Sequence, residues 1–399
     1  MDPESPKDSS GAFSDCSSDR SGEFPPSPAA AAAGGGGGGG GAAFQRLLLS
    51  CAAESSDEVI RGLVAELESG SAPVESLRRA AMELRLLAKH NTENRLRIAG
   101  AGAVRPLVAL LAHADPQLQE HGVTALLNLS LCDENKAAIA EAGAIRPLVR
   151  ALKTGTPAAR ENAAFALLRL AQLDGLSAAI GRAGAIPLLV ALLEAGSARG
   201  KKDAAAALFA LCCGGGGGAR ENRARAVEAG AVRPLLDLMA EPESGMVDKA
   251  AYVLNALAAS AEGRAAAVED GGIPVLVEMV EAGTPRQKEI ATLALLQICE
   301  HCAAHRVMVA REGAIPPLVA LSQSPAAKPK LKIKIRIFDE RTVSGGVDRA
   351  IASTEVCRRA RVGLRRGEED ADKKESTWRD LRMGEGTRGF ILFLPTLGM

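Results

Sequence analysis

The chain has 399 residues, with 48 Lys or Arg balanced by 48 Asp or Glu, so its formal net charge is zero. A balanced charge lacks the strong positive field of a nucleic-acid-binding protein, so we expect no nucleic-acid partner. Eight cysteines without framework spacing and an N-terminus without a signal peptide predict reduced thiols and a cytoplasmic or nuclear location.

Residues 1–43 are of low complexity. Ser, Pro and Asp dominate the start, and a run of alanine (residues 29–33) and a run of glycine (residues 34–41) follow. Such a segment cannot bury enough apolar surface to offset its conformational entropy. We therefore expect an acidic disordered tail, in which Ser5-Pro6 and Ser27-Pro28 are either phosphorylation sites or plain solvated residues.

Residues 44–92 carry amphipathic helical patterns. The short segment Phe44–Cys51 is expected to pack as a lid. Two longer helices are predicted at Asp57–Leu67 and Val74–Lys89. Because the terminal unit of a helical stack needs an atypical outer face, we interpret residues 44–92 as N-terminal capping helices with a truncated first repeat.

One phrase, Gly-Ala-Ile or Gly-Ala-Val followed by Pro and an apolar run, then recurs with small variations. It begins at Gly102, Gly143, Gly184, Gly230, Gly271 and Gly313, at intervals of 41, 41, 46, 41 and 42 residues. The glycine permits a sharp turn between helices, and the proline falls in the first turn of the next helix, where its missing N–H costs nothing. A fixed period near forty with helical patterning is typical of an armadillo or HEAT-type solenoid.

We therefore predict an all-α armadillo-repeat fold, a right-handed superhelical solenoid with three helices in each repeat of about 41 residues, over residues 93–322. Asp115-Pro116, Thr156-Pro157 and Thr284-Pro285 each place an N-cap residue before a proline, which predicts the start of a third helix. The predicted third helices are Gln117–Leu131, Ala158–Leu173, Arg199–Cys212, Met246–Ala259 and Arg286–Glu300.

The repeats resemble those of a known family. Leu86-Leu87-Ala88-Lys89, the run Ala125-Leu126-Leu127-Asn128-Leu129-Ser130 and the phrase at Gly313 look like armadillo repeats of plant U-box ubiquitin ligases and of related plant armadillo-only proteins. The resemblance covers residues 57–334. It implies a substrate-recognition region, without the U-box domain that recruits the ubiquitin-charged conjugating enzyme, because no U-box motif precedes the repeats.

The pattern breaks down in residues 323–399. The first part still resembles the start of the family's closing helix, but Ile333–Ile337 alternates with a period of two, like a strand with no sheet to join. The rest is charged and irregular, and its apolar run Phe390–Leu394 is far shorter than the roughly 20 residues of a membrane span. We expect a disordered tail and no membrane partner.

No catalytic motif is recognisable, because the glycine runs lack the fixed offsets and the lysine of a phosphate-binding loop. The one dense set of metal-ligand residue types is Cys299, His301, Cys302 and His305. Its spacing is unlike that of zinc knuckles, which favours packing and helix capping over metal binding. We therefore expect no enzyme activity, no cofactor and no metal.

The third helices are expected to line a concave protein-binding groove. In armadillo proteins that resemble importin alpha, Trp and Asn four residues apart on these helices hold an extended peptide, and this ladder is nearly absent here. Phe165, Arg169 and Tyr252 are the expected anchors of a partner. The predicted groove residues are His121, Thr124, Asn128, Asn162, Phe165, Arg169, Asp203, Ala206, Ala210, Lys249, Tyr252, Ala256, Leu293 and Gln297.

The sequence thus predicts a protein-interaction scaffold, by resemblance a substrate-binding or adaptor protein in ubiquitin-linked signalling. One alternative is a ligase-independent scaffold in transport or cytoskeletal assembly, and another, of a different class, is a zinc-binding or catalytic protein. We expect a monomer with protein partners in the groove.

Overall fold

The computed structural model describes residues 57–173, 175–213, 217–323 and 335. Within these residues every regular element is a helix and no strand is present. The predicted tail at residues 1–43, the lid at Phe44–Cys51 and the C-terminal tail lie outside the described residues, apart from Gln323 and Ile335. The elements are α3 (Asp57–Glu68), α4 (Val74–His90), α5 (Thr92–Gly100), α6 (Val104–Leu110), α7 (Pro116–Leu129), α8 (Asp133–Glu141), α9 (Ile145–Thr154), α10 (Pro157–Ala171), α11 (Leu176–Arg182), α12 (Ala185–Ala195), α13 (Ala198–Cys212), α14 (Gly217–Glu228), α15 (Val232–Met239), the 3₁₀ helix η2 (Pro242–Ser244), α16 (Val247–Leu257), α17 (Ala261–Glu269), α18 (Gly272–Ala282), α19 (Pro285–Cys299), α20 (Ala303–Arg311) and α21 (Ile315–Gln323).

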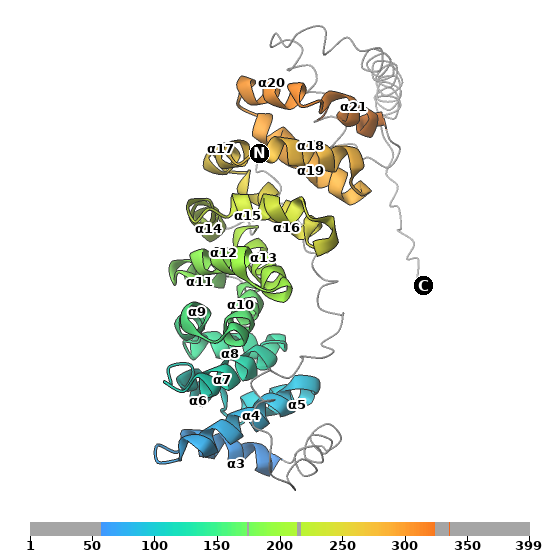
Figure 1. Cartoon of the computed structure of the whole chain (residues 1–399). Coiled ribbons are helices and arrows are strands. Elements are labelled where there is room, and N and C mark those ends of the chain that lie inside the picture. Colours follow the sequence, from blue (N-terminus) through green and yellow to red (C-terminus); the bar gives the residue numbers. More distant parts are fainter. Residues whose placement is uncertain (1–56, 174, 214–216, 324–334, 336–399) are drawn as a thin grey trace, which may run out of the picture. The chain divides into compact units, whose positions relative to one another are not determined.

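The helices follow the predicted three-helix repeat, and Figure 1 labels them and colours them along the sequence. The first glycine of each recurring phrase has φ between +76° and +90°, which confirms the turn between the first and second helices. Each second helix then carries a proline in its first turn, for example Pro106 in α6 and Pro147 in α9. Only glycine adopts this backbone conformation without strain, which explains why the phrase begins with glycine.

The predicted third helices are confirmed with shifts of one or two residues at their ends. Asp115, Thr156 and Thr284 are N-caps whose side chains accept hydrogen bonds from the backbone of the first turn, and each precedes a proline at N1. Thr284 and Gln287 also form a capping box, in which each side chain bonds the other's backbone N–H. The same role in α13 falls to Ser197, which has no following proline.

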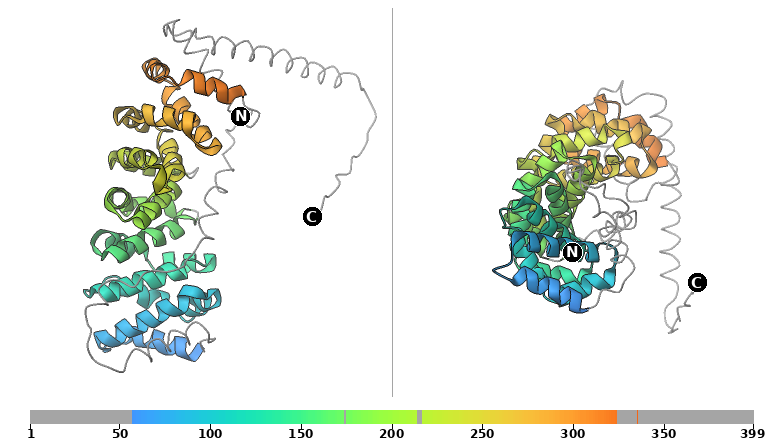
Figure 2. Two further views of the ribbon diagram at one scale, coloured as in Figure 1. Left: turned by 45° about the vertical axis from the view of Figure 1, so that its right-hand side comes forward. Right: turned by 60° about the horizontal axis from the view of Figure 1, so that its bottom comes forward.

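The chain forms two compact units, residues 1–234 and 235–399 of the sequence, and the boundary falls inside α15. In unit 1 the third helices α4, α7, α10 and α13 pack consecutively against one another. Figure 2 shows the helices of this unit, coloured from blue to green, stacked in layers. In unit 2 the third helices α16 and α19 pack together in the same way. Their buried sides consist mainly of Leu, Ile, Val and Ala, so each added repeat extends the core.

A recurring polar contact joins neighbouring third helices of unit 1 near their N-termini. The N-cap Asp115 of α7 pairs with Arg78 of α4, with 2.8 Å between Oδ2 and Nη2. In the next two layers the N-cap is a hydroxyl and its partner is an acid, so Thr156 donates to Glu120 at 2.6 Å and Ser197 donates to Glu161 at 2.5 Å. We call these contacts cap joints, and each combines one anion with one cation or hydroxyl.

The cap joints predict a charge-swap experiment. Thr156→Asp is expected to destabilise the protein by about 1 kcal/mol, because a second carboxylate then faces Glu120. Adding Glu120→Arg should recover most of this loss, because the pair then reproduces Arg78 and Asp115. Urea unfolding of the two single variants and the double variant measures the coupling, and additive losses would contradict the joint.

Among the described helices, none alone is long and apolar enough to cross a membrane. The bent pair α11 and α12, with 78° between them, passes the same test of length and composition.

Candidate functional site

The third helices α10 and α13 each present one row of residues, at spacings of four, three, one and three residues, and all of these residues are partly or fully exposed except the buried Ala206. On α10 the row is Glu161, Phe165, Leu168, Arg169 and Gln172, and on α13 it is Lys202, Ala206, Phe209, Ala210 and Cys213. This spacing places a row on one side of a helix. The two rows are offset by 41 residues and lie on adjacent helices, so they form one surface of unit 1, which we call the α10–α13 face.

Several predicted groove residues prove to be buried between the helices. Thr124, Asn128, Asn162 and Ala206 are each less than 9 % exposed. Asn128 donates from Nδ2 to the carbonyl oxygen of Arg85 on the neighbouring α4, at 3.0 Å. Its amide is therefore engaged between repeats, which corrects the expectation that it lies open to a partner.

Thr124 and Asn162 belong to a hydrogen-bond chain across three third helices of unit 1. Thr124 Oγ1 donates to the Glu120 carbonyl at 2.7 Å and accepts from Asn162 Nδ2 at 2.9 Å. Asn162 Oδ1 in turn accepts from Arg199 Nη2 of α13 at 2.8 Å. Arg199 also lies 3.5 Å from Asp203 Oδ2, so the charge of Asp203, a predicted groove residue, is partly neutralised by its own helix.

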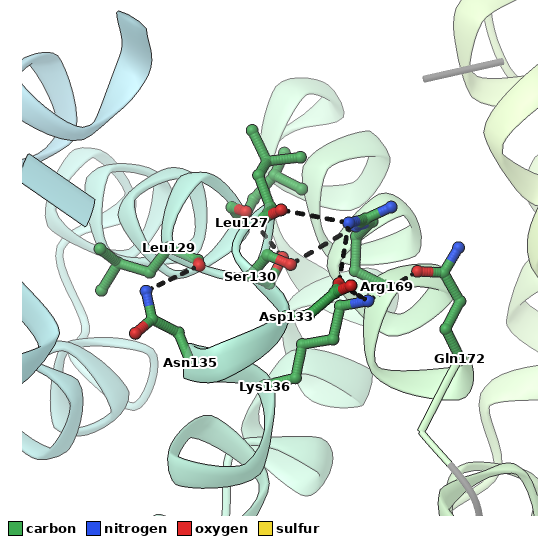
Figure 3. Close-up of polar contacts among 9 residues, drawn as sticks. Leu127, Leu129, Ser130, Asp133, Asn135, Lys136, Arg169 and Gln172 are labelled. Atoms are coloured by element: carbon green, nitrogen blue, oxygen red, sulfur yellow. Dashed lines mark hydrogen bonds and ion pairs between the residues drawn. The ribbon is translucent and has the colours of Figure 1, made fainter. Parts of the chain in front are cut away.

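Arg169 was expected to be an open anchor for a partner, and the structure corrects this expectation. Its side chain is only 15 % exposed and lies 3.5 Å from Asp133 Oδ1. It donates to the carbonyls of Ser130 and Leu131, which follow the last turn of α7 (Figure 3). An Arg169→Glu variant would therefore lose contacts of the fold as well as contacts to a partner, so it is not a clean test of binding.

The same junction contains polar residues whose role was not predicted (Figure 3). Asn135 Nδ2 donates to the carbonyls of Leu129 and Arg95, both at 3.1 Å. The neighbouring Lys136 is 4 % exposed and bonds Asp133 and Gln172. Asn135 and Arg169 thus donate to carbonyl groups at the end of α7 that have no partner within the helix, whereas Lys136 bonds side chains.

The junction recurs in other repeats. Asn94 donates to the Leu87 carbonyl at 3.3 Å, and Asn222 donates to the Leu211 carbonyl at 3.0 Å. In the sequence, the Glu-Asn pairs at residues 93–94, 134–135 and 221–222 mark the first helix of each of these repeats. In each of these repeats the Asn lies eight residues before the first glycine of the recurring phrase. This regular spacing was the signal that could have identified the Asn as a buried hydrogen-bond donor.

His121, a predicted groove residue, lies beside Arg85, with 3.0 Å between Nδ1 and Nη1. Burial and the Arg85 charge lower the pKa of His121 from 6.5 to about 4. The ring is therefore neutral at pH 7 and adds no charge to the third-helix surface.

The depressed pKa of His121 predicts a pH dependence. The unfolded state binds a proton near pH 6.5 and the folded state only near pH 4, so stability is full above pH 6.5 and falls as the pH drops towards 4. These pKa values alone give about 2 kcal/mol between pH 7 and pH 5, but the ring is partly exposed and screened by solvent, so we expect a loss of about 1 kcal/mol, which His121→Gln should abolish. Urea unfolding at the two pH values measures it, and an equal loss in the variant would assign it to other groups.

In unit 2 the corresponding rows lie on α16 and α19. Tyr252 is partly exposed, and Arg286 of α19 donates from Nε to its hydroxyl at 3.0 Å. The Arg286 guanidinium also lies 5.3 Å from the centre of the Tyr252 ring. Of the other predicted residues here, Lys249, Ala256, Leu293 and Gln297 are all partly exposed.

Two of the four candidate metal ligands, Cys299 and His305, have contacts within the fold. Cys299 is buried at the end of α19, and burial raises its pKa to about 12. His305 Nδ1 lies 3.0 Å from the Ile298 carbonyl, and His301 is exposed. Within the described residues no group of three or more His, Cys, Asp or Glu is arranged to hold a metal ion.

The repeats match known solved structures. An engineered protein superposes with a TM-score of 0.61 at 26 % identity, over 77 % of each chain. A computationally designed armadillo repeat protein for modular peptide recognition gives a TM-score of 0.53 at 27 % identity, over 60 % of this chain and 99 % of its own. A designed armadillo repeat protein in complex with the peptide (KR)4 gives 0.51 at 26 % identity, over 60 % and 99 %.

The sequence relatives are plant proteins. The chain is 61 % identical over 239 residues to U-box domain-containing protein 4 of Arabidopsis thaliana, which covers 60 % of this chain and 28 % of that protein. It is 54 % identical over 237 residues to U-box domain-containing protein 3 of the same plant, covering 59 % and 30 %. The chain therefore spans less than a third of the length of these two relatives. Residues 60–334 match the model of the plant U-box protein ARM repeat region, and the chain belongs to this family of armadillo repeats.

Proposed function

We propose that the chain acts as a substrate-binding or adaptor arm in ubiquitin-linked signalling. Armadillo repeats form a non-catalytic protein-interaction scaffold, and designed proteins of the same fold were made for peptide recognition. The observation that carries the proposal is the match of residues 60–334 to the repeats of plant U-box proteins. The repeat surface supplies the binding, and ubiquitin transfer requires a U-box or another ligase domain.

A capture experiment tests this proposal. The full chain, expressed with an affinity tag in plant cells, is used to isolate its partners, and ubiquitin remnants on those partners are measured by mass spectrometry. We expect overexpression to change the ubiquitin occupancy of the captured partners relative to unrelated proteins. Partners that bind with no change in ubiquitin occupancy would contradict the ubiquitin role and support a ligase-independent scaffold.

A further inference from the structure

We infer that the α10–α13 face of unit 1 binds an acidic protein segment that carries apolar side chains. The inference rests on the proposed protein-binding function and adds the chemistry of the partner. It differs from the basic peptide (KR)4 found in the complex of a designed protein of similar fold.

The centre of the face is apolar. Phe165, Leu168 and Phe209 are partly exposed there, next to the partly exposed Ala210 and the buried Ala206. Partly exposed aromatic residues beside small ones are suitable anchors, because a few aromatic contacts supply most of the energy of an interface. This centre favours a partner with Leu- or Phe-like side chains.

The acidic groups near the face are already engaged. Glu161 accepts from Ser197 at 2.5 Å and lies 4.0 Å from Arg199. Asp203 lies 3.5 Å from the same guanidinium. An incoming Lys or Arg side chain would therefore have to displace a contact of the fold before it could pair with either carboxylate.

The cationic groups outnumber the acids on these two helices. Helix α10 carries two Arg and one Glu, and α13 carries one Arg, two Lys and one Asp, but Arg169 and Arg199 are already bonded within the fold. Lys202 is exposed and belongs to the α13 row itself, one turn from Ala206. A partner with Asp or Glu beside its apolar residues would complement this surface, whereas an alternating Lys-Arg peptide would be repelled.

Four labelled peptides of equal length, (DL)4, (DG)4, (KL)4 and (KR)4, test the inference by fluorescence anisotropy with the full chain. We expect (DL)4 to bind about 10-fold more tightly than (KL)4, because acidic side chains are attracted by the cationic groups of the face and basic side chains are repelled by them. The peptide (DG)4 should bind more weakly than (DL)4, because it lacks the apolar contacts. Tighter binding of (KR)4 or (KL)4, or no binding of (DL)4 at millimolar concentration, would overturn the inference.

Two charge-matched variants test the location. Lys202→Glu should weaken (DL)4 binding about 3- to 10-fold. Arg150→Glu makes the same change on the exposed side of the second helix α9 and should change binding less than about twofold. A third variant, Leu168→Ser, should weaken (DL)4 while leaving (DG)4 unchanged, with thermal unfolding as the check on folding.

Unchanged (DL)4 binding in Lys202→Glu and Leu168→Ser would place the site elsewhere. That result would overturn the inference about this face but would leave the captured partners and their ubiquitin occupancy untouched. Conversely, selective (DL)4 binding together with unchanged ubiquitin occupancy of the captured partners would support the inference about this face and contradict the ubiquitin role. The two failures are therefore distinguishable.

Discussion

Gly181→Ala is expected to destabilise the protein by about 3 kcal/mol. An ideal Cβ at Gly181 of α11 would lie 1.8 Å from Oδ1 of Asn222 in α14. Asn222 cannot easily move, because it is fully buried and its Nδ2 donates to the carbonyls of Ser177 and Leu211 at 2.9 and 3.0 Å. The variant therefore combines the cost of overpacking with that of broken buried hydrogen bonds. Urea unfolding measures the loss.

Gly62→Ala in α3 is the matched control. Nothing lies within 4 Å of a Cβ at this helical glycine, so alanine should stabilise the protein by up to about 1 kcal/mol through helix propensity. The double variant Gly181→Ala with Asn222→Ala should lose less than the sum of the two single losses, because the clash is then removed. Equal effects of Gly62→Ala and Gly181→Ala would contradict the close approach of α11 and α14.

Asn135→Asp is expected to cost about 3 kcal/mol. Aspartate has nearly the same shape but no N–H group, so the Leu129 and Arg95 carbonyls would lose the bond from Asn135 and face a buried carboxylate. Urea unfolding at pH 7 checks the loss.

Asn91→Asp provides the same chemical change in an exposed position. Asn91 caps α5 by accepting from the Asn94 backbone N–H at 3.1 Å, and aspartate caps a helix equally well. We expect a change within about 0.5 kcal/mol. Similar losses in the two variants would show that the Asn135 amide does not hold the end of α7.

Much of the fold was predictable from the sequence, because its determinants are local. A glycine that needs positive φ, and a capping residue before proline, act through the backbone of their own few residues, as at Gly143 and Thr156. The helix rows were also predictable in part. Adding three residues to Phe165 and Ala206 would have found Leu168 and Phe209.

The roles of individual polar residues were not predictable in the same way. Arg169 and Asn128 were expected to face a partner because of their helical position, yet both bond backbone carbonyls about 40 residues away. The sequence shows which side of a helix a residue occupies, but not whether a neighbouring repeat already satisfies its hydrogen bonds. That depends on distances between helices, which only the packed structure provides.

Site-specific photo-crosslinking tests the central claim, that unit 1 binds its partner through the α10–α13 face. A benzophenone amino acid is placed at position 168, in the α10 row, or at position 150, on the exposed side of α9, in the full chain. Each form is mixed with a partner isolated by capture and irradiated, and the cross-linked product is identified by mass spectrometry. The account predicts a product from position 168 and none from position 150, and the reverse result would contradict it.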